Sequence, residues 1–320
     1  MAIDKFNTAD WGTVASVSGV ASGTIDNIGG FEATVTLTYG GTPVISDITA
    51  SWSSGSNSNA KVFWDTTNAV AVNLPSTRSS GDFMMMVITS ENDLTIAHET
   101  NPTSPNQETE QTGATVSGWT CMNSEHGVTH NNGRWHWGDS NSDADIYVFY
   151  RVCNGTESST INTYGIQTNG YEGGGEGEKT FVMAQTFILS NIDTSNPTFN
   201  VGNWLGAGSQ IGWQNPHHVD APSVTSTSAG LLLCLCAFDG GDHSSSTPSY
   251  CSFTMTNSNF TLTNGYNYNA SYNSGAGISM GMKYAAIGEN TASGDTYMKQ
   301  TDNLRDGIVG VQIVVHGAYS

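Results

Sequence analysis

Most apolar residues of this chain alternate with polar ones, but two short segments are apolar throughout. These are FMMMVI (83–88) and LLLCLC (231–236), and each follows shortly after a Gly. Alternation predicts strands with one buried face, whereas a short continuous run predicts a central strand covered on both faces. No stretch combines helical periodicity with freedom from Gly and β-branched runs. The pattern predicts an all-β protein, an antiparallel β-sandwich or jelly roll with very little helix.

Three landmarks occur twice, in the same order along the chain. They are LPSTRSSGDF (74–83) and APSVTSTSAGL (221–231), the strand-to-Gly-turn segments 150–156 and 284–291, and FVMAQTFIL (181–189) and IVGVQIVV (308–315), each with a central Gln. Such self-similarity indicates an internally duplicated β unit whose second copy has shorter loops. Chance similarity between β-rich segments is the alternative.

We expect three parts: a docking segment over 1–30, a first β unit over 31–200 and a second over 201–320. The first part contains VASVSGV (14–20) and IDNIGGF (25–31), which share a spacing of apolar residues and Gly. Two such short units bury little apolar surface alone, so we expect them to pack on another protein. The docking positions would be Val14, Val17, Val20, Ile25, Ile28 and Phe31. A pair of ordinary strands is the alternative.

Two long polar segments, 90–120 and 165–180, contain too few apolar residues for a core. We expect them to be loops, where binding residues are often found. The segment NPHHVD (215–220) is expected to be a linker before the second unit.

Charge excludes several classes of partner. Only 12% of the residues are charged, and the chain has 9 Lys and Arg but 28 Asp and Glu. Nucleic acids and anionic membrane surfaces need a basic footprint, so neither is expected. No apolar run is long enough to span a bilayer, and the start shows no secretory signal.

The five cysteines do not form a zinc or disulfide framework, because no Cys-x-x-Cys spacing occurs. Cys234 and Cys236 alternate with leucines and are expected to be small core residues. We expect a setting in which disulfides are not required, such as assembly in a cytoplasm.

The densest group of polar and aromatic residues lies in HGVTHNNGRWHWGDSNSDAD (126–145). On a strand, Trp135 and Trp137 fall on one side and His136 on the other. The tryptophans would form either part of a core or a platform for a sugar, and a bound cation such as calcium stays open. The candidate contact residues are Trp119, Trp135, His136, Trp137, Asp139 and Tyr171.

No motif indicates catalysis. GGGEGEKT (173–180) resembles a phosphate loop, but Glu178 separates Gly177 from Lys179 and a strand follows in place of the helix. No nucleophile elbow is present, and none of the many acidic residues forms a specific pair. We assign no catalytic residue and no cofactor, and we expect a protein that is not an enzyme.

Several short motifs resemble a domain found in bacteriophage virion proteins. They are Gly81-Asp82 before an apolar strand, Gly118-Trp119-Thr120, and Tyr150-Arg151-Val152 running into Gly155-Thr156-Glu157. The second copy departs from the pattern, with Ala229-Gly230 and Tyr284-Ala285-Ala286.

The resemblance implies a β-sandwich structural module on a virion assembled in the host cytoplasm, either a capsid decoration protein or a tail-fibre-type protein. Its partners would be other virion proteins and further copies of itself, as a homo-oligomer such as a trimer. A host-surface glycan would be a further ligand if the chain is instead a carbohydrate-binding module. A polysaccharide depolymerase is the third alternative.

Overall fold

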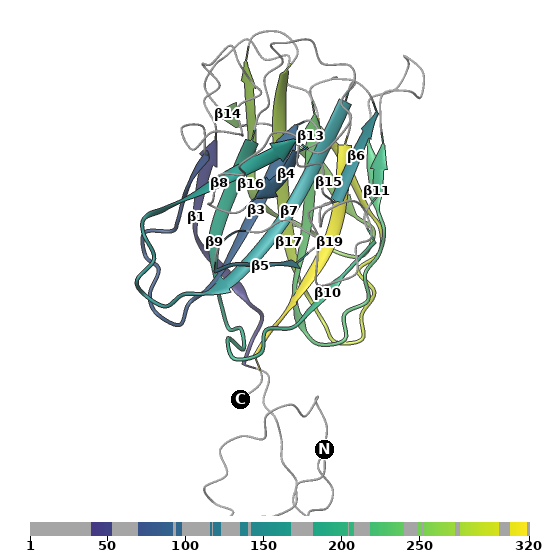
Figure 1. Cartoon of the computed structure of the whole chain (residues 1–320). Coiled ribbons are helices and arrows are strands. Elements are labelled where there is room, and N and C mark those ends of the chain that lie inside the picture. Colours follow the sequence, from purple (N-terminus) through teal and green to yellow (C-terminus); the bar gives the residue numbers. More distant parts are fainter. Residues whose placement is uncertain are drawn as a thin grey trace, which may run out of the picture.

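The structure is a computed structural model, and it describes residues 40–52, 70–91, 94–97, 116, 118–122, 135–139, 142–167, 182–203, 205–207, 218–239, 249–250, 253–272, 276–300 and 308–318. Within these ranges the chain forms nineteen β-strands, and the strand pairs are antiparallel (Figure 1). The predicted all-β class is confirmed. Within the same ranges, no helix is long and apolar enough to cross a membrane.

The first half of the chain forms one large sheet and one small sheet. The large sheet has the order β1 (Val44–Trp52), β9 (Val182–Ser190), β3 (Phe83–Glu91), β7 (Ser142–Val152) and β5 (Thr120–Cys121), with β6 (Trp135–Asp139) also paired to β7. The small sheet has the order β2 (Val70–Asn73), β8 (Thr160–Gln167) and β4 (Leu94–Ala97).

The second half also forms a large and a small sheet. The large one has the order β10 (Phe199–Val201), β19 (Ile308–His316), β13 (Gly230–Asp239), β17 (Ala276–Ile287), β16 (Thr263–Tyr272) and β14 (Ser249–Tyr250), with β11 (Leu205–Ala207) also on β19. The small one has the order β12 (Val219–Ala221), β18 (Thr296–Gln300) and β15 (Phe253–Asn257).

The strand order of the first half therefore recurs in the second. Strands β1, β9, β3 and β7 have β10, β19, β13 and β17 as their counterparts, and β2, β8 and β4 have β12, β18 and β15. The register agrees as well: Phe83 lies opposite Leu189 in the first sheet, and Leu231 lies opposite Val315 in the second. Both pairs face the same core, so these positions correspond.

The inner faces of the two large sheets pack against each other and form one shared core. The first sheet contributes Phe83, Met85, Val87, Ile146, Val148 and Phe187, and the second contributes Leu231, Leu233, Leu235, Met280, Met282 and Ile313. Because side chains alternate along a strand, every second residue of each large sheet points away from this shared core.

Each outward face is covered by the small sheet of the same half. Met84, Met86 and Ile88 pack beneath Val72 and Leu74, and in the second half Cys234, Cys236 and Phe238 pack beneath Met255 and Met298. Strands β3 and β13 are therefore central and buried on both faces, which confirms the prediction from the two continuous apolar runs. The placement of Cys234 and Cys236 in the core is confirmed too.

Several predicted boundaries need correction. The segment 90–120 is not all loop, because β4 lies within it and pairs with β8, which itself extends to Gln167. The segment 215–220 is not only a linker, since β12 begins at Val219. The unit boundary at residue 200 falls inside β10, which pairs with the second sheet. The segment 1–30 lies outside the described residues.

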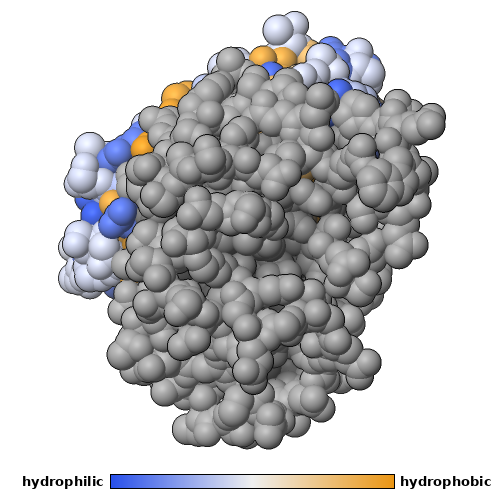
Figure 2. Space-filling view, turned by 90° about the horizontal axis from the view of Figure 1, so that it is seen from above, coloured by the Kyte–Doolittle hydropathy of each residue, from blue (hydrophilic) through white to orange (hydrophobic). Residues whose placement is uncertain are grey.

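The fully described turns gather at one end of the molecule, the lower end in Figure 1. We call this end the base. It comprises the turns 74–82, 153–159, 191–198, 222–229, 258–262 and 288–295, together with residues 40–43 and 317–318. The opposite ends of these strands lead into segments outside the described ranges. Seen from above, the described side chains form only a margin on which hydrophilic and hydrophobic residues mix (Figure 2).

Candidate functional site

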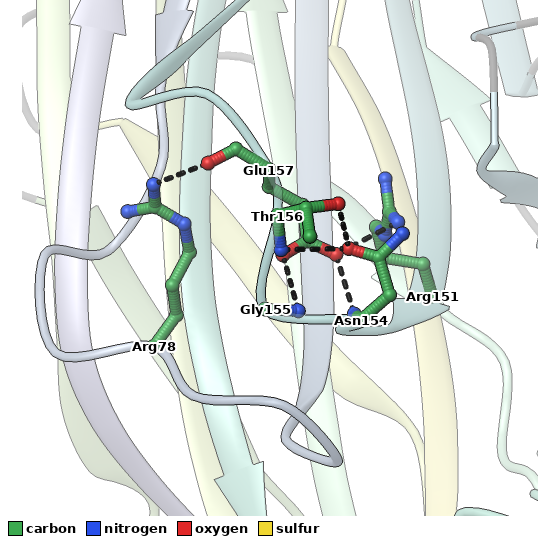
Figure 3. Close-up of polar contacts among 6 residues, drawn as sticks. All are labelled: Arg78, Arg151, Asn154, Gly155, Thr156 and Glu157. Carbon is green, nitrogen blue, oxygen red and sulfur yellow. Dashed lines mark hydrogen bonds and ion pairs between the residues drawn. The ribbon is translucent and has the colours of Figure 1, made fainter.

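The motif residues around Gly81, Trp119, Arg151 and Glu157 come together in the first-half part of the base. Gly81 donates its backbone N–H to the Cys153 carbonyl at 2.8 Å, and Cys153 donates its backbone N–H to the Asp82 carbonyl at 2.8 Å. These two bonds join the turn before β3 to the turn after β7. Glu157 lies in the second of these turns, with Arg78 and Arg151 on either side of it (Figure 3).

Glu157 is the centre of this cluster, and its side chain is only 3% exposed. One carboxylate oxygen accepts the Asn154 N–H at 2.6 Å and the other accepts the Gly155 N–H at 3.0 Å. Arg151 Nη2 lies 2.8 Å from Glu157 Oε1. Burial acts to raise the pKa of Glu157, but the backbone N–H groups and Arg151 outweigh it and lower the pKa. The carboxylate is therefore held ionised as part of the turn.

The turn itself needs Gly155, whose φ of 80° lies in the left-handed region. Asn154 fixes the same turn, since its Oδ1 accepts both the N–H and the hydroxyl of Thr156 at 2.8 Å. The Asn-Gly-Thr-Glu sequence thus encodes a cradle of backbone N–H groups that a carboxylate from the same turn fills.

Arg151 links this turn to the preceding motif. Its guanidinium lies 5.7 Å from the ring centroid of Trp119, a cation–π arrangement. Trp119 is only 8% exposed and belongs to the outer core of the first half. The indole is therefore a core residue beside Arg151, and little of its surface is accessible for the glycan contact expected from the sequence.

A second arginine fixes the turn from the other side. Arg78 donates from Nη1 to the Pro75 carbonyl at 2.8 Å and from Nη2 to the Glu157 carbonyl at 2.9 Å. Thr77 in the same turn donates its N–H, at 2.8 Å, and its hydroxyl, at 2.5 Å, to Asp47 in β1. The contacts of both arginines and of the Glu157 and Asp47 carboxylates thus lie within the protein. Together they hold the turns 74–82 and 153–159 in place, and we call them the lock of the first half.

In the second half, the turns of the base are held by the side-chain amides of Gln312 and Asn200 and by the imidazole of His316. Gln312 Nε2 donates to the carbonyls of Ala221 at 2.8 Å, Pro222 at 3.0 Å and Gly294 at 2.8 Å. These contacts tie β19 to the turns 222–229 and 288–295. The locks of the two halves therefore differ in chemistry although their strand orders agree.

His316 completes this lock. Its Nε2 lies 2.6 Å from Asn200 Oδ1, and its Nδ1 lies 2.9 Å from Thr198 Oγ1. Asn200 Oδ1 also accepts the Thr227 N–H at 2.8 Å, so the imidazole donates from Nε2 and accepts at Nδ1. This places a neutral imidazole between the strand β10 and the turn before β13. Burial lowers the pKa of His316.

The remaining predicted contacts do not share one surface. Trp135 and Trp137 lie opposite Ile146 and Ala144 in the register of β6 and β7. His136 lies opposite Asp145, and Asp139 lies opposite Ser142. The register places these residues along one strand at the edge of the large sheet, whereas Trp119 lies beside β5 on the other part of β7.

Other predicted sites lie outside the part of the chain that the structure describes. These are Tyr171 and the docking positions Val14, Val17, Val20, Ile25, Ile28 and Phe31. Among the described side chains, no group of three or more His, Cys, Asp or Glu residues could hold a metal ion.

Two of the buried cysteines in the described ranges, Cys153 and Cys234, are free thiols. Burial raises the pKa of Cys153 to about 11 and that of Cys234 to about 12, so both thiols stay protonated.

No local sequence pattern marks the roles of Arg78, Gln312 and His316, because their contacts join segments that are distant in the sequence. The one available signal was composition: Arg is rare in this chain, and two of its arginines lie in the first-half motifs.

No family model, curated protein or solved structure matches this chain.

Proposed function

We propose that this chain is a non-catalytic structural component of a bacteriophage virion, exposed on the particle surface and docked through residues 1–30. It serves as a capsid decoration protein or a tail-fibre-type protein. Its partners are other virion proteins and further copies of the chain, with a trimer as the expected oligomer.

The single observation that carries the proposal is the use of the motif residues. In the motifs that resemble phage virion proteins, Trp119, Arg151 and Glu157 carry the side chains best suited to binding or catalysis. Each of them instead makes contacts within the protein that hold the turns of the base together. A motif used in this way encodes a stable scaffold rather than a reactive centre. The polar but charge-poor composition supports the same interpretation.

The direct test is to purify particles of the phage that encodes the chain and to quantify the chain in them by mass spectrometry. We expect a fixed copy number per particle that survives a gradient wash. Absence of the chain from washed particles would contradict the proposal.

A second experiment tests the docking segment. Deleting residues 2–30 should abolish incorporation into particles while leaving the circular dichroism spectrum and the unfolding midpoint of the rest unchanged, because the deletion ends well before β1. A truncated chain that is incorporated as well as the full chain would refute docking through this segment.

A further inference from the structure

The small sheet of the second half presents one face to solvent. Along its strands β12, β18 and β15, every second residue points into the outer core, among them Val219, Met298 and Met255. The residues between these point away from the core, because side chains alternate along a strand. We call this face, with the residue that precedes β12, the outer platform, and it consists of His218, Asp220, Thr254, Thr256, Tyr297 and Lys299.

Two rings form the centre of the outer platform. The imidazole of His218 stacks on the phenol ring of Tyr297, with 4.7 Å between the ring centroids and 27° between the ring planes. Asp220 lies opposite Tyr297 in the strand register, and its Oδ2 lies 3.8 Å from His218 Nε2. The side chains of His218 and Asp220 are 46% and 55% exposed. The aromatic pair is therefore accessible, and a carboxylate lies beside it.

Several polar groups of the outer platform are not used to hold the fold. Within the described part of the chain, the hydroxyls of Thr254, Thr256 and Tyr297 and the ammonium of Lys299 make no hydrogen bond or ion pair. At the base, by contrast, the buried carboxylate, amide and imidazole side chains contact other segments of the protein. Donors and acceptors that the protein leaves to water are available to a ligand.

The small sheet of the first half provides an internal comparison. Val72 lies opposite Ile161 in that sheet, and Val219 lies opposite Met298 in the second. Both pairs pack in the outer core of their own half, so these positions correspond.

At the next position of these strands the two halves differ. The pair that follows is Asn73 with Thr160 in the first half, but Asp220 with Tyr297 in the second. The same scaffold thus carries small neutral side chains in one half. An aromatic ring and a carboxylate are not needed to form it, which points to a role of Tyr297 and Asp220 other than folding.

The chemistry of the outer platform selects a class of ligand. The platform is an open sheet face about 10 Å across its three strands, so a purely apolar ligand would leave most of its surface in water. Asp220 and the net charge of −19 oppose a polyanion. A saccharide fits both limits. Its C–H groups pack on the negative face of an aromatic ring, and its hydroxyls donate to Asp220 and accept from Lys299.

We propose that the outer platform binds an uncharged oligosaccharide. One sugar ring packs against the pair of Tyr297 and His218, and Asp220 and Lys299 orient it through its hydroxyls. None of these four residues is among the glycan contacts expected from the sequence. The site adds a binding activity to the proposed structural role and does not depend on it.

Saturation-transfer-difference NMR with the purified full chain tests this site. The probes are the uncharged hexasaccharides of glucose, mannose, galactose and N-acetylglucosamine. We expect saturation of the ring C–H protons of at least one probe, and a signal at least tenfold weaker with Tyr297→Ala. Thr160→Ala, at the corresponding position of the first half, is the control and should keep the full signal. No signal from any probe, or equal signals with Tyr297→Ala and the unmodified chain, would overturn the inference.

Two further variants separate ligand contact from folding. Tyr297→Phe keeps the ring and should retain at least half of the signal, whereas Asp220→Ala removes an acceptor and should weaken the signal at least threefold. The thermal unfolding midpoints of both should equal that of the unmodified chain. A loss in Tyr297→Phe as large as in Tyr297→Ala would contradict the stacking role. Absence of the chain from particles would refute the proposed function and leave this result unchanged, so the two failures are distinct.

Discussion

At the residue scale, the base is held by a small number of buried polar side chains, each of which satisfies several groups at once. Glu157 accepts two backbone N–H groups and faces Arg151, and Gln312 contacts three carbonyls. Because the chain has few charged residues, these buried contacts, rather than many weak ion pairs on the surface, hold the turns of the base together. Removing one partner leaves the other buried and unpaired, which is costly.

We therefore expect Glu157→Gln to lower the free energy of unfolding by about 2–4 kcal/mol, as measured by urea denaturation at pH 7. The matched control is Asp220→Asn, which changes an exposed contact of 3.8 Å between Asp220 Oδ2 and His218 Nε2, whose side chains are 55% and 46% exposed, and it should cost at most about 0.5 kcal/mol. Equal effects of the two variants would show that Glu157 does not stabilise the turn.

The same carboxylate predicts a dependence on acid. Because the folded state lowers the pKa of Glu157 below its ordinary value of 4.5, its stabilisation is present above that value and is lost as the pH falls through the folded pKa. The unfolding midpoint of Glu157→Gln should fall less steeply between about pH 5 and pH 3 than that of the unmodified chain. Asp47 and Asp193, whose pKa values are also lowered, largely by hydrogen bonds from Thr77 and Ser195, should supply the remaining slope.

His316 predicts a second change at higher pH. Burial lowers its pKa below the ordinary value of 6.5, so the unfolded chain binds a proton first and stability decreases as the pH falls below about 6.5. We expect the urea midpoint to drop between pH 7.5 and pH 5.5, and this drop to shrink in His316→Gln. A drop of the same size in the variant would assign it to another group.

At the scale of single elements, close packing of the small second sheet depends on a row of small residues. Gly310, Cys236 and Gly281 lie side by side across β19, β13 and β17. A Cβ on Gly281 would lie 2.6 Å from Met255 Cε and 2.9 Å from both Cys236 Sγ and Phe253 Cγ. The row allows Met255 and Met298 to approach the large sheet closely.

Gly281→Ala should therefore lower the free energy of unfolding by about 1–3 kcal/mol, the usual cost of overpacking. Gly288→Ala is the control, since the nearest atom to its added Cβ is Thr291 Oγ1 at 3.2 Å in an exposed turn. Thermal unfolding of both variants followed by circular dichroism checks this. An unchanged midpoint in Gly281→Ala would show that the small sheet can shift outward.

The elements also show what the sequence could predict and what it could not. Continuous apolar runs identified β3 and β13, because only a central strand buries both faces. Strands β4 and β12 were missed, since each is short and lies among polar residues that alone favour a loop. The motif residues were recognised, but their joint role was not, because Arg78 and Glu157 are distant in sequence and meet only through the fold.

One landmark of the repeat was misleading. The two central glutamines seemed equivalent, yet Gln185 lies on the inner face of β9 and Gln312 on the outer face of β19. The register places Thr186 opposite Met86 and Gln312 opposite Cys234, both on outer faces, and Thr186 donates to the Asn73 carbonyl at 2.6 Å. Thr186 is thus the counterpart of Gln312. A shift of one residue in a strand reverses the face, and sequence similarity alone does not detect it.

At the scale of the whole molecule, the two halves pack face to face, and each half buries the apolar inner face of the other. The inner faces carry large apolar side chains such as Phe83, Leu233 and Met282, so separation would expose a wide apolar surface to water. The connection 191–198 is therefore not needed to hold the halves together once they have folded.

This can be tested by inserting a specific protease site between Asn196 and Pro197 and cleaving the folded protein. We expect the two fragments to elute together in native size-exclusion chromatography and to separate only in denaturant. Two separate native peaks would show that the covalent connection, rather than the shared core, keeps the halves together.

The hydrogen bond between Gly40 and Ala318 has a consequence for protein engineering. A short Gly-Ser linker could fuse these two residues, and new termini could then be opened at the bond between residues 196 and 197. Such a circular permutant would keep each described strand pair of the four sheets, since neither change interrupts a strand. The order in which the two halves follow each other along the chain is therefore not required for the described strand pairing.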